Sequence, residues 1–175
     1  TVNMAVPDGA DIVFVERIEN SDGVRILGHF GRRLPAHTTS SGKAIAAWNT
    51  RADAARRRAG FPPRVSKTVR TEADWDRCLD SVRKVGNAVS HSESFDGASS
   101  VAVPVISHRE AIASISVFGP TEIIQPQVDR PAPVHVPASR PSARVHTPWP
   151  AGLPGRGEAG VPFTRSSTRS TSPLT

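Results

Sequence analysis

A run of small hydroxyl residues at positions 38–41 leads directly into an apolar helical pattern at residues 43–48. Gly42 lies between the two, and a glycine permits close approach of another backbone or of a ligand. The first N–H groups of a helix lack intrahelical partners and carry partial positive charge, so they suit a bound anion such as a carboxylate. The same residues also suit an ordinary N-cap at Ser40 or Ser41. The pattern alone leaves both interpretations open.

Signatures of catalysis and metal binding are missing from the remainder of the sequence. It contains no Gly-x-Ser-x-Gly elbow, no His-Glu-x-x-His pair and no phosphate-binding loop. His29, His37, His91 and His108 occur singly, without the spacing of metal ligands, which favours structural or surface roles. The sequence therefore predicts a protein that is not an enzyme and that requires no metal or cofactor.

Apolar runs bounded by turn residues predict five strands, at residues 2–6, 11–18, 24–30, 100–106 and 111–118. The first two form a hairpin, because Pro7-Asp8-Gly9-Ala10 between them has the residues of a tight turn. The last two are likewise joined by a short polar turn at residues 107–110.

Three helices are predicted between these two groups of strands, at residues 40–48, 52–59 and 72–85. The third has the clearest boundaries: Thr71 is a good N-cap, Asp74 follows three residues later, and Gly86 suits the C-terminal stop. Cys78 lies on the apolar stripe of this helix, so we expect a core residue rather than a reactive thiol. The order of the elements predicts an α+β fold, an antiparallel sheet with flanking helices.

The composition changes after Ile124. Residues 1–124 hold 16 basic and 14 acidic residues, a net charge of +2, whereas residues 125–175 hold six Arg and two acids, a net charge of +4. Ten of the 16 prolines also lie in the last 51 residues, which show no apolar periodicity. We therefore predict a folded domain at residues 1–124 and a disordered Pro/Arg-rich tail at residues 125–175. The basic excess belongs mostly to the tail, where the Arg residues are spread singly rather than clustered as in a nucleic-acid-binding arm.

Features of the whole chain indicate a cytoplasmic protein. Cys78 is the single cysteine in 175 residues, so no internal disulfide can form and a reducing compartment is expected. No run of about 18 apolar residues could span a membrane, and the N-terminus lacks the pattern of a secretory signal.

Four segments together resemble the effector-binding domain of the IclR family of bacterial transcription regulators. They are residues 1–6 with the following hairpin, residues 31–44, residues 82–93, and the strand pair at 101–105 and 115–120. The resemblance covers about residues 1–122. It implies a GAF-like fold, related to PAS domains, with a pocket on one face of the sheet.

The resemblance also implies a function and a site. A small organic acid is expected in the pocket, and its binding is expected to shift a dimer or tetramer so that separate winged helix-turn-helix domains change their grip on operator DNA. The effector-binding residues that it implies are Ser40, Ser41, Ser90, Ser100 and Ser116.

The sequence departs from the family pattern in several places. Some members have an acidic residue at the position of Ser90 and a serine at that of Phe118, which leaves the ligand open. We expect the winged helix-turn-helix domain to be absent from this chain, and the family's long terminal helix to be missing because the Pro-rich tail cannot form it. A non-functional, truncated or frameshifted remnant therefore stays an alternative, followed by a basic nucleic-acid-binding protein.

Overall fold

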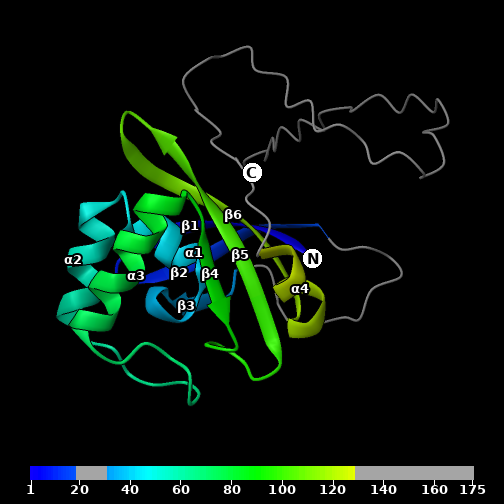
Figure 1. The fold of residues 1–175 in the computed structure, drawn as a ribbon. Helices are drawn as coiled ribbons and strands as arrows, with labels where there is room; N and C mark the ends of the chain where they lie inside the picture. Colours follow the sequence, from blue (N-terminus) through cyan, green and yellow to red (C-terminus); the bar gives the residue numbers. More distant parts are fainter. Residues whose placement is uncertain (19–30, 129–175) are drawn as a thin grey trace, which may run out of the picture. The chain divides into compact units, whose positions relative to one another are not determined.

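The computed structural model describes residues 1–18 and 31–128 (Figure 1). Six strands and four α-helices follow one another in two blocks of strands separated by helices. In chain order they are β1 (Val2–Asp8), β2 (Asp11–Ile18), β3 (Arg33–Pro35), α1 (Ser40–Ala46), α2 (Thr50–Ala59), α3 (Glu72–Val85), β4 (Ala88–His91), β5 (Ala98–Ser107), β6 (Glu110–Pro120) and α4 (Thr121–Val128). A single 3₁₀ turn, Ala36–Thr38, leads into α1.

The strands form one antiparallel sheet in the order β3-β2-β1-β6-β5-β4. The predicted α+β class, an antiparallel sheet with flanking helices, is confirmed. The prediction missed β3, which has three residues, and β4, which has four. Strands this short give too little alternation to distinguish them from loops. The strand predicted at residues 24–30 lies outside the described residues.

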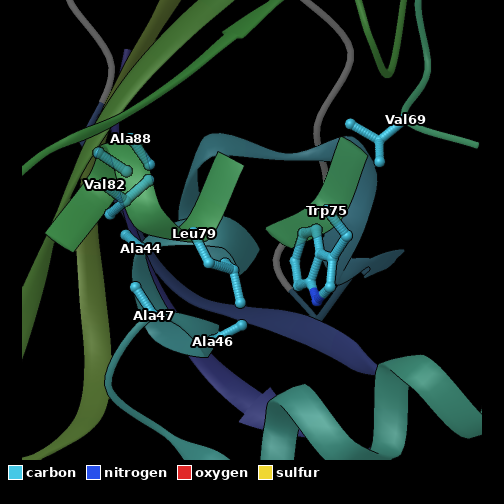
Figure 2. Close-up of a cluster of buried hydrophobic side chains, with 9 residues drawn as sticks. Ala44, Ala46, Ala47, Val69, Trp75, Leu79, Val82 and Ala88 are labelled. Atoms are coloured by element: carbon cyan, nitrogen blue, oxygen red, sulfur yellow. The ribbon is translucent and has the colours of Figure 1, made fainter. Parts of the chain in front are cut away.

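The most securely predicted helix, α3, has the expected ends. The Thr71 hydroxyl accepts a hydrogen bond from the Asp74 N–H at 3.1 Å, and Gly86 adopts the left-handed conformation with φ of 89°. Trp75, Leu79 and Val82 on its apolar face are buried in one cluster (Figure 2). The partly buried Cys78 packs against this cluster. Because the side chains of this stripe fill the space beside α1, removing one of them by an alanine substitution should cost about 2–5 kcal/mol.

Helix α1 packs directly on the sheet, contacting β1, β4, β5 and β6. Gly42 allows this helix to approach the preceding 3₁₀ turn, since a Cβ added at Gly42 would lie 2.2 Å from the Ala36 carbonyl oxygen. Alanines on both sides of the contact, such as Ala44 on α1 and Ala102 on β5, keep the helix close. We call the sheet face that bears α1 the inner face.

The chain after Pro120 differs from the prediction. We expected regular structure to end at Ile124 and the Pro-rich sequence to form no helix, yet α4 extends through Pro126 to Val128. In a helix of two turns a proline removes one backbone hydrogen bond, a cost that contacts can offset. Ile124 is buried and lies against Gly119, and α4 lies beside β5 on the face opposite α1 (Figure 1). None of the helices in the described ranges has the length and apolar character needed to cross a membrane.

Candidate functional site

Cross-strand pairs on the inner face place polar side chains in two rows. In the first row, Asn3 of β1 lies opposite Arg17 of β2 on one side and Ser116 of β6 on the other. Directly opposed residues of an antiparallel sheet point to the same face, with Cβ atoms about 4.5–5.5 Å apart. A guanidinium, an amide and a hydroxyl group therefore stand side by side.

The second row lies next to the first. Ser100 of β5 is opposite Phe118 of β6 and Ser90 of β4. The Ser100 and Ser40 hydroxyl oxygens are 2.7 Å apart, which joins this row to α1. An aromatic side chain and several hydroxyl groups thus continue the same surface toward the β4 edge.

The start of α1 differs by one residue from the prediction that Ser40 or Ser41 caps the helix. Thr39 is the N-cap, and its hydroxyl accepts a hydrogen bond from the Gly42 N–H at 2.9 Å. Thr39 has the extended backbone conformation that is typical of an N-cap. Ser40 and Ser41 therefore lie inside the first helical turn. The segment therefore contains an ordinary N-cap, but the capping residue is Thr39, which binds the Gly42 N–H. The Ser40 and Ser41 hydroxyl groups are not used for capping.

A pocket of about 710 Å³, counting the space at its mouth, lies between α1 and the two rows. Its walls contain all five serines that the resemblance implied: Ser40, Ser41, Ser90, Ser100 and Ser116. Each is at most 8% exposed. The chain therefore brings together residues from one helix and three strands that are up to 76 positions apart in sequence. Their role as ligand-binding groups stays a prediction.

The hydroxyl groups of the pocket differ in their hydrogen bonds. Ser90 and Ser94 both donate to the Thr38 carbonyl oxygen, at 3.2 and 2.5 Å. Within the described part of the chain, Ser41 and Ser116 make no side-chain hydrogen bond. These two hydroxyl groups can donate to a ligand without first breaking a bond inside the protein.

The sequence analysis missed several further pocket residues: Asn3, Phe14, Arg17, Arg32, Ser94 and Phe95. Arg32 precedes β3, and its guanidinium carbon lies 4.9 Å from the centre of the Phe95 ring, which also lines the pocket. Arg64 approaches the same ring at 5.6 Å. Positive charge therefore borders a pocket with aromatic walls.

A β-bulge decides which charged residue lies opposite Asn3 in the first row. The register of β1 and β2 shifts between Met4 and Ala5, so that Val15 has no partner of its own. Without the shift, Asn3 would lie opposite Glu16; with it, Asn3 lies opposite Arg17. Glu16 is exposed, borders the pocket as well, and accepts a hydrogen bond from the Arg17 backbone N–H at 2.9 Å. No signal in the sequence marks the bulge.

A buried ion pair holds two sides of the pocket together. Lys43 of α1 lies 2.6 Å from both carboxylate oxygens of Glu93 and donates to the Val89 carbonyl oxygen at 3.1 Å. The Lys43 and Glu93 side chains are 4% and 12% exposed. Because Glu93 adjoins Ser94 and Phe95, this pair fixes the segment between β4 and β5 against α1.

His37 is buried next to the pocket but does not line it. Its Nε2 donates to the Pro62 carbonyl oxygen at 3.0 Å, and the ring meets Phe61 edge to face. Burial, aided by the positive charges of Arg56 and Lys43, lowers the pKa of His37 to about 4. This histidine is neutral at pH 7 and has a structural role, as the sequence predicted. In residues 1–18 and 31–128, no group of three His, Cys, Asp or Glu side chains is placed to hold a metal ion.

An antiparallel six-stranded sheet with helix α1 packed over a pocket on one face agrees with the predicted α+β, GAF/PAS-like fold class. Comparison with known proteins gives the particular family. The chain belongs to the IclR family, because the family described as "Bacterial transcriptional regulator IclR C-terminal" matches residues 1–131.

Individual relatives agree with this assignment. The HTH-type transcriptional regulator KdgR of Escherichia coli is 28% identical over 124 residues, which are 69% of this chain and 47% of KdgR. The p-hydroxybenzoate hydroxylase transcriptional activator of Acinetobacter baylyi is 30% identical over 135 residues, 73% of this chain and 50% of that protein. The chain spans about half the length of the curated relatives that it matches. All of these relatives are named as regulators rather than as enzymes.

A solved structure shows the same fold. The inducer-binding domain of a double mutant of the PobR transcription factor from Acinetobacter, in complex with 3-hydroxybenzoic acid, superposes with a TM-score of 0.64 and 28% sequence identity. The match covers 72% of this chain and 76% of the PobR domain.

Proposed function

We propose that this domain binds a small organic acid in the pocket between α1 and the inner face, and thereby regulates transcription in the bacterial cytoplasm. Binding would shift a dimer or tetramer and alter the hold of separate helix-turn-helix domains on operator DNA. The observation that carries the proposal is the convergence of five serines from α1, β4, β5 and β6 on one pocket bordered by arginines.

The chemistry of the pocket suits an acid with an apolar body. Phe14, Phe95 and Phe118 supply apolar walls, and the Ser41 and Ser116 hydroxyl groups can donate to a carboxylate. Hydrogen bonds to a charged group contribute about 1.5–3 kcal/mol each. The complex of the related PobR domain with 3-hydroxybenzoic acid supports the same class of ligand.

A thermal-shift screen with small carboxylates tests this function. A ligand that binds only the native state raises stability by about 2.7 kcal/mol at 100 times its Kd. We expect at least one acid to raise the melting temperature, and Ser41→Asp to abolish that rise by placing a negative charge in the pocket. Ser81→Asp, on the exposed surface of α3, adds the same charge outside the pocket and should keep the rise.

Two outcomes would contradict the proposal. If no acid stabilises the chain, the remnant hypothesis is favoured, to which the exposed apolar residues of the sheet also point. If Ser41→Asp leaves the affinity for every acid unchanged, the ligand does not bind at this site. Salt-dependent retention on DNA that is lost on deleting residues 125–175 would instead favour a nucleic-acid-binding protein.

A further inference from the structure

Residues 92–97, which connect β4 to β5, contact both the pocket and α4. We call them the β4–β5 segment. Both of its ends have left-handed backbone conformations, with φ of 53° at Ser92 and 74° at Gly97. This conformation is uncommon for serine and persists only where the surrounding structure imposes it. The contacts of the β4–β5 segment therefore decide its shape.

On one side, the β4–β5 segment forms part of the pocket wall, through Ser94 and Phe95. The residue before them, Glu93, is held by its buried ion pair with Lys43 of α1. The Glu93 carbonyl oxygen also accepts a hydrogen bond from the Thr68 hydroxyl at 2.8 Å. These contacts fix the backbone of the segment, and a molecule that packs on Ser94 and Phe95 adds to them.

On its other side, the β4–β5 segment holds the start of α4. The Gly97 carbonyl oxygen accepts a hydrogen bond at 2.9 Å from the N–H of Thr121, the first residue of this helix. The first N–H groups of a helix have no partner within it, so this bond satisfies one of them from outside. The Thr121 hydroxyl also lies 3.4 Å from that of Ser92. The segment thus supplies a carbonyl and a hydroxyl group to the N-terminal end of α4.

Helix α4 depends on such contacts because it is short. It has eight residues, and one of them, Pro126, lacks an N–H group. Isolated helices shorter than about 12–15 residues are marginally stable in water. Among side chains 121–125, only that of Ile124 is buried. An element held by so few contacts opens locally at low cost, so a displacement of the β4–β5 segment is enough to release it.

We propose that the β4–β5 segment couples the pocket to α4, so that a molecule held against Ser94 and Phe95 also stabilises α4 on the opposite face of the sheet (Figure 1). This inference rests on the proposed function, because it describes how occupancy of the same pocket is passed on. Coupling between two sites is reciprocal, so the wall binds a ligand more tightly when α4 is in place. Substitutions in the wall measure the coupling without a ligand.

Amide hydrogen exchange of the full chain, followed by NMR at single residues, provides the test. Phe95→Ala truncates the pocket wall within the segment, and Phe14→Ala makes the same truncation in the part of the wall on β2. The measured quantity is the exchange rate at Thr121 relative to that at Leu79, which is buried in α3 and reports unfolding of the whole domain. Phe95→Ala should raise this ratio at least about fivefold, whereas Phe14→Ala should leave it within about twofold of the wild-type value.

A second pair of variants decides the question where Phe95→Ala does not fold. Ser94→Ala removes one hydroxyl group from the segment and should raise the same ratio, whereas Ser116→Ala, in the pocket wall on β6, should not. The proposal is overturned if the ratio is unchanged in both segment variants, or if the control variants raise it equally. Since no ligand is present, that result leaves the proposed function to the carboxylate screen, and a failed screen would leave the coupling in place.

Discussion

The two faces of the sheet have opposite characters. On the inner face, Asn3 and Ser116 form a buried or half-buried polar pair, whereas the neighbouring residues of the same strands, Val2 and Val117, form an exposed apolar pair on the other face. Both Val2 and Val117 are about 40% exposed. Antiparallel sheets ordinarily bury their apolar side and expose their polar side.

This inversion distinguishes a binding face from a packing face. Polar groups are tolerated on the inner face because they line a pocket or pair with α1, as Ser40 does with Ser100. The outer face is covered at one end by α4, where the Thr121 hydroxyl lies 2.9 Å from that of Ser99. The apolar residues beyond α4 form an exposed patch, which we call the outer patch: Val2, Met4, Ile115 and Val117.

The largest predicted change in the free energy of unfolding concerns the packing of α1 on the inner face. Gly42→Ala places a Cβ 2.2 Å from the Ala36 carbonyl oxygen, a clash with backbone that only a shift of α1 can relieve. We expect a loss of more than about 4 kcal/mol of unfolding free energy, measured by urea denaturation. Gly119→Ala on the outer face meets only the Ile124 side chain at 3.4 Å and should cost less than about 1 kcal/mol. Equal losses at both sites would refute this difference between the faces.

Acid sensitivity should come from the inner side of the sheet. Because the pKa of His37 is lowered to about 4, the unfolded state binds a proton more readily, and stability is lost as pH falls below about 6.5. Between pH 7 and pH 5 this group should contribute a loss of about 2 kcal/mol.

Urea denaturation at both pH values measures this loss. His37→Gln removes the titrating group, so the stability of this variant, although lower at pH 7, should change little over the same interval. An unchanged pH dependence in His37→Gln would assign the acid sensitivity to another group.

The smallest effect is expected at the outer patch. Ile115→Thr combined with Val117→Thr replaces exposed apolar groups by residues of similar β-propensity. We expect a change in unfolding free energy within about 1 kcal/mol, but clearly lower binding of a hydrophobic dye. A large loss of stability would mean that the outer patch is buried in solution, by another part of the protein or by a second copy.

The parts of the fold that were predictable are those encoded locally. Thr71 and Gly86 fix the ends of α3 through their own hydrogen-bonding and backbone preferences, and the turn at Gly9, with φ of 61°, fixes the first hairpin. The positions of Ser90 and Ser100 in the pocket came from family resemblance, since nothing in the local sequence pairs them.

The parts that could not be predicted depend on tertiary context. The bulge at Val15 puts Arg17 rather than Glu16 opposite Asn3, so a shift of one residue reverses the charge beside Asn3. Likewise, α4 continues through Pro126, and its Ile124 is buried against the sheet. Helix propensities do not include such a tertiary contact.

The central claim is that the inner face binds an acid through its own polar groups. Titration of one stabilising carboxylate into Ser116→Ala and Ser114→Ala tests it most directly, because both serines lie on β6 and only Ser116 lines the pocket. We predict that Ser116→Ala raises the Kd about tenfold, the loss of one hydrogen bond to a charged group, and that Ser114→Ala leaves it unchanged. Equal affinities in both variants would contradict the account.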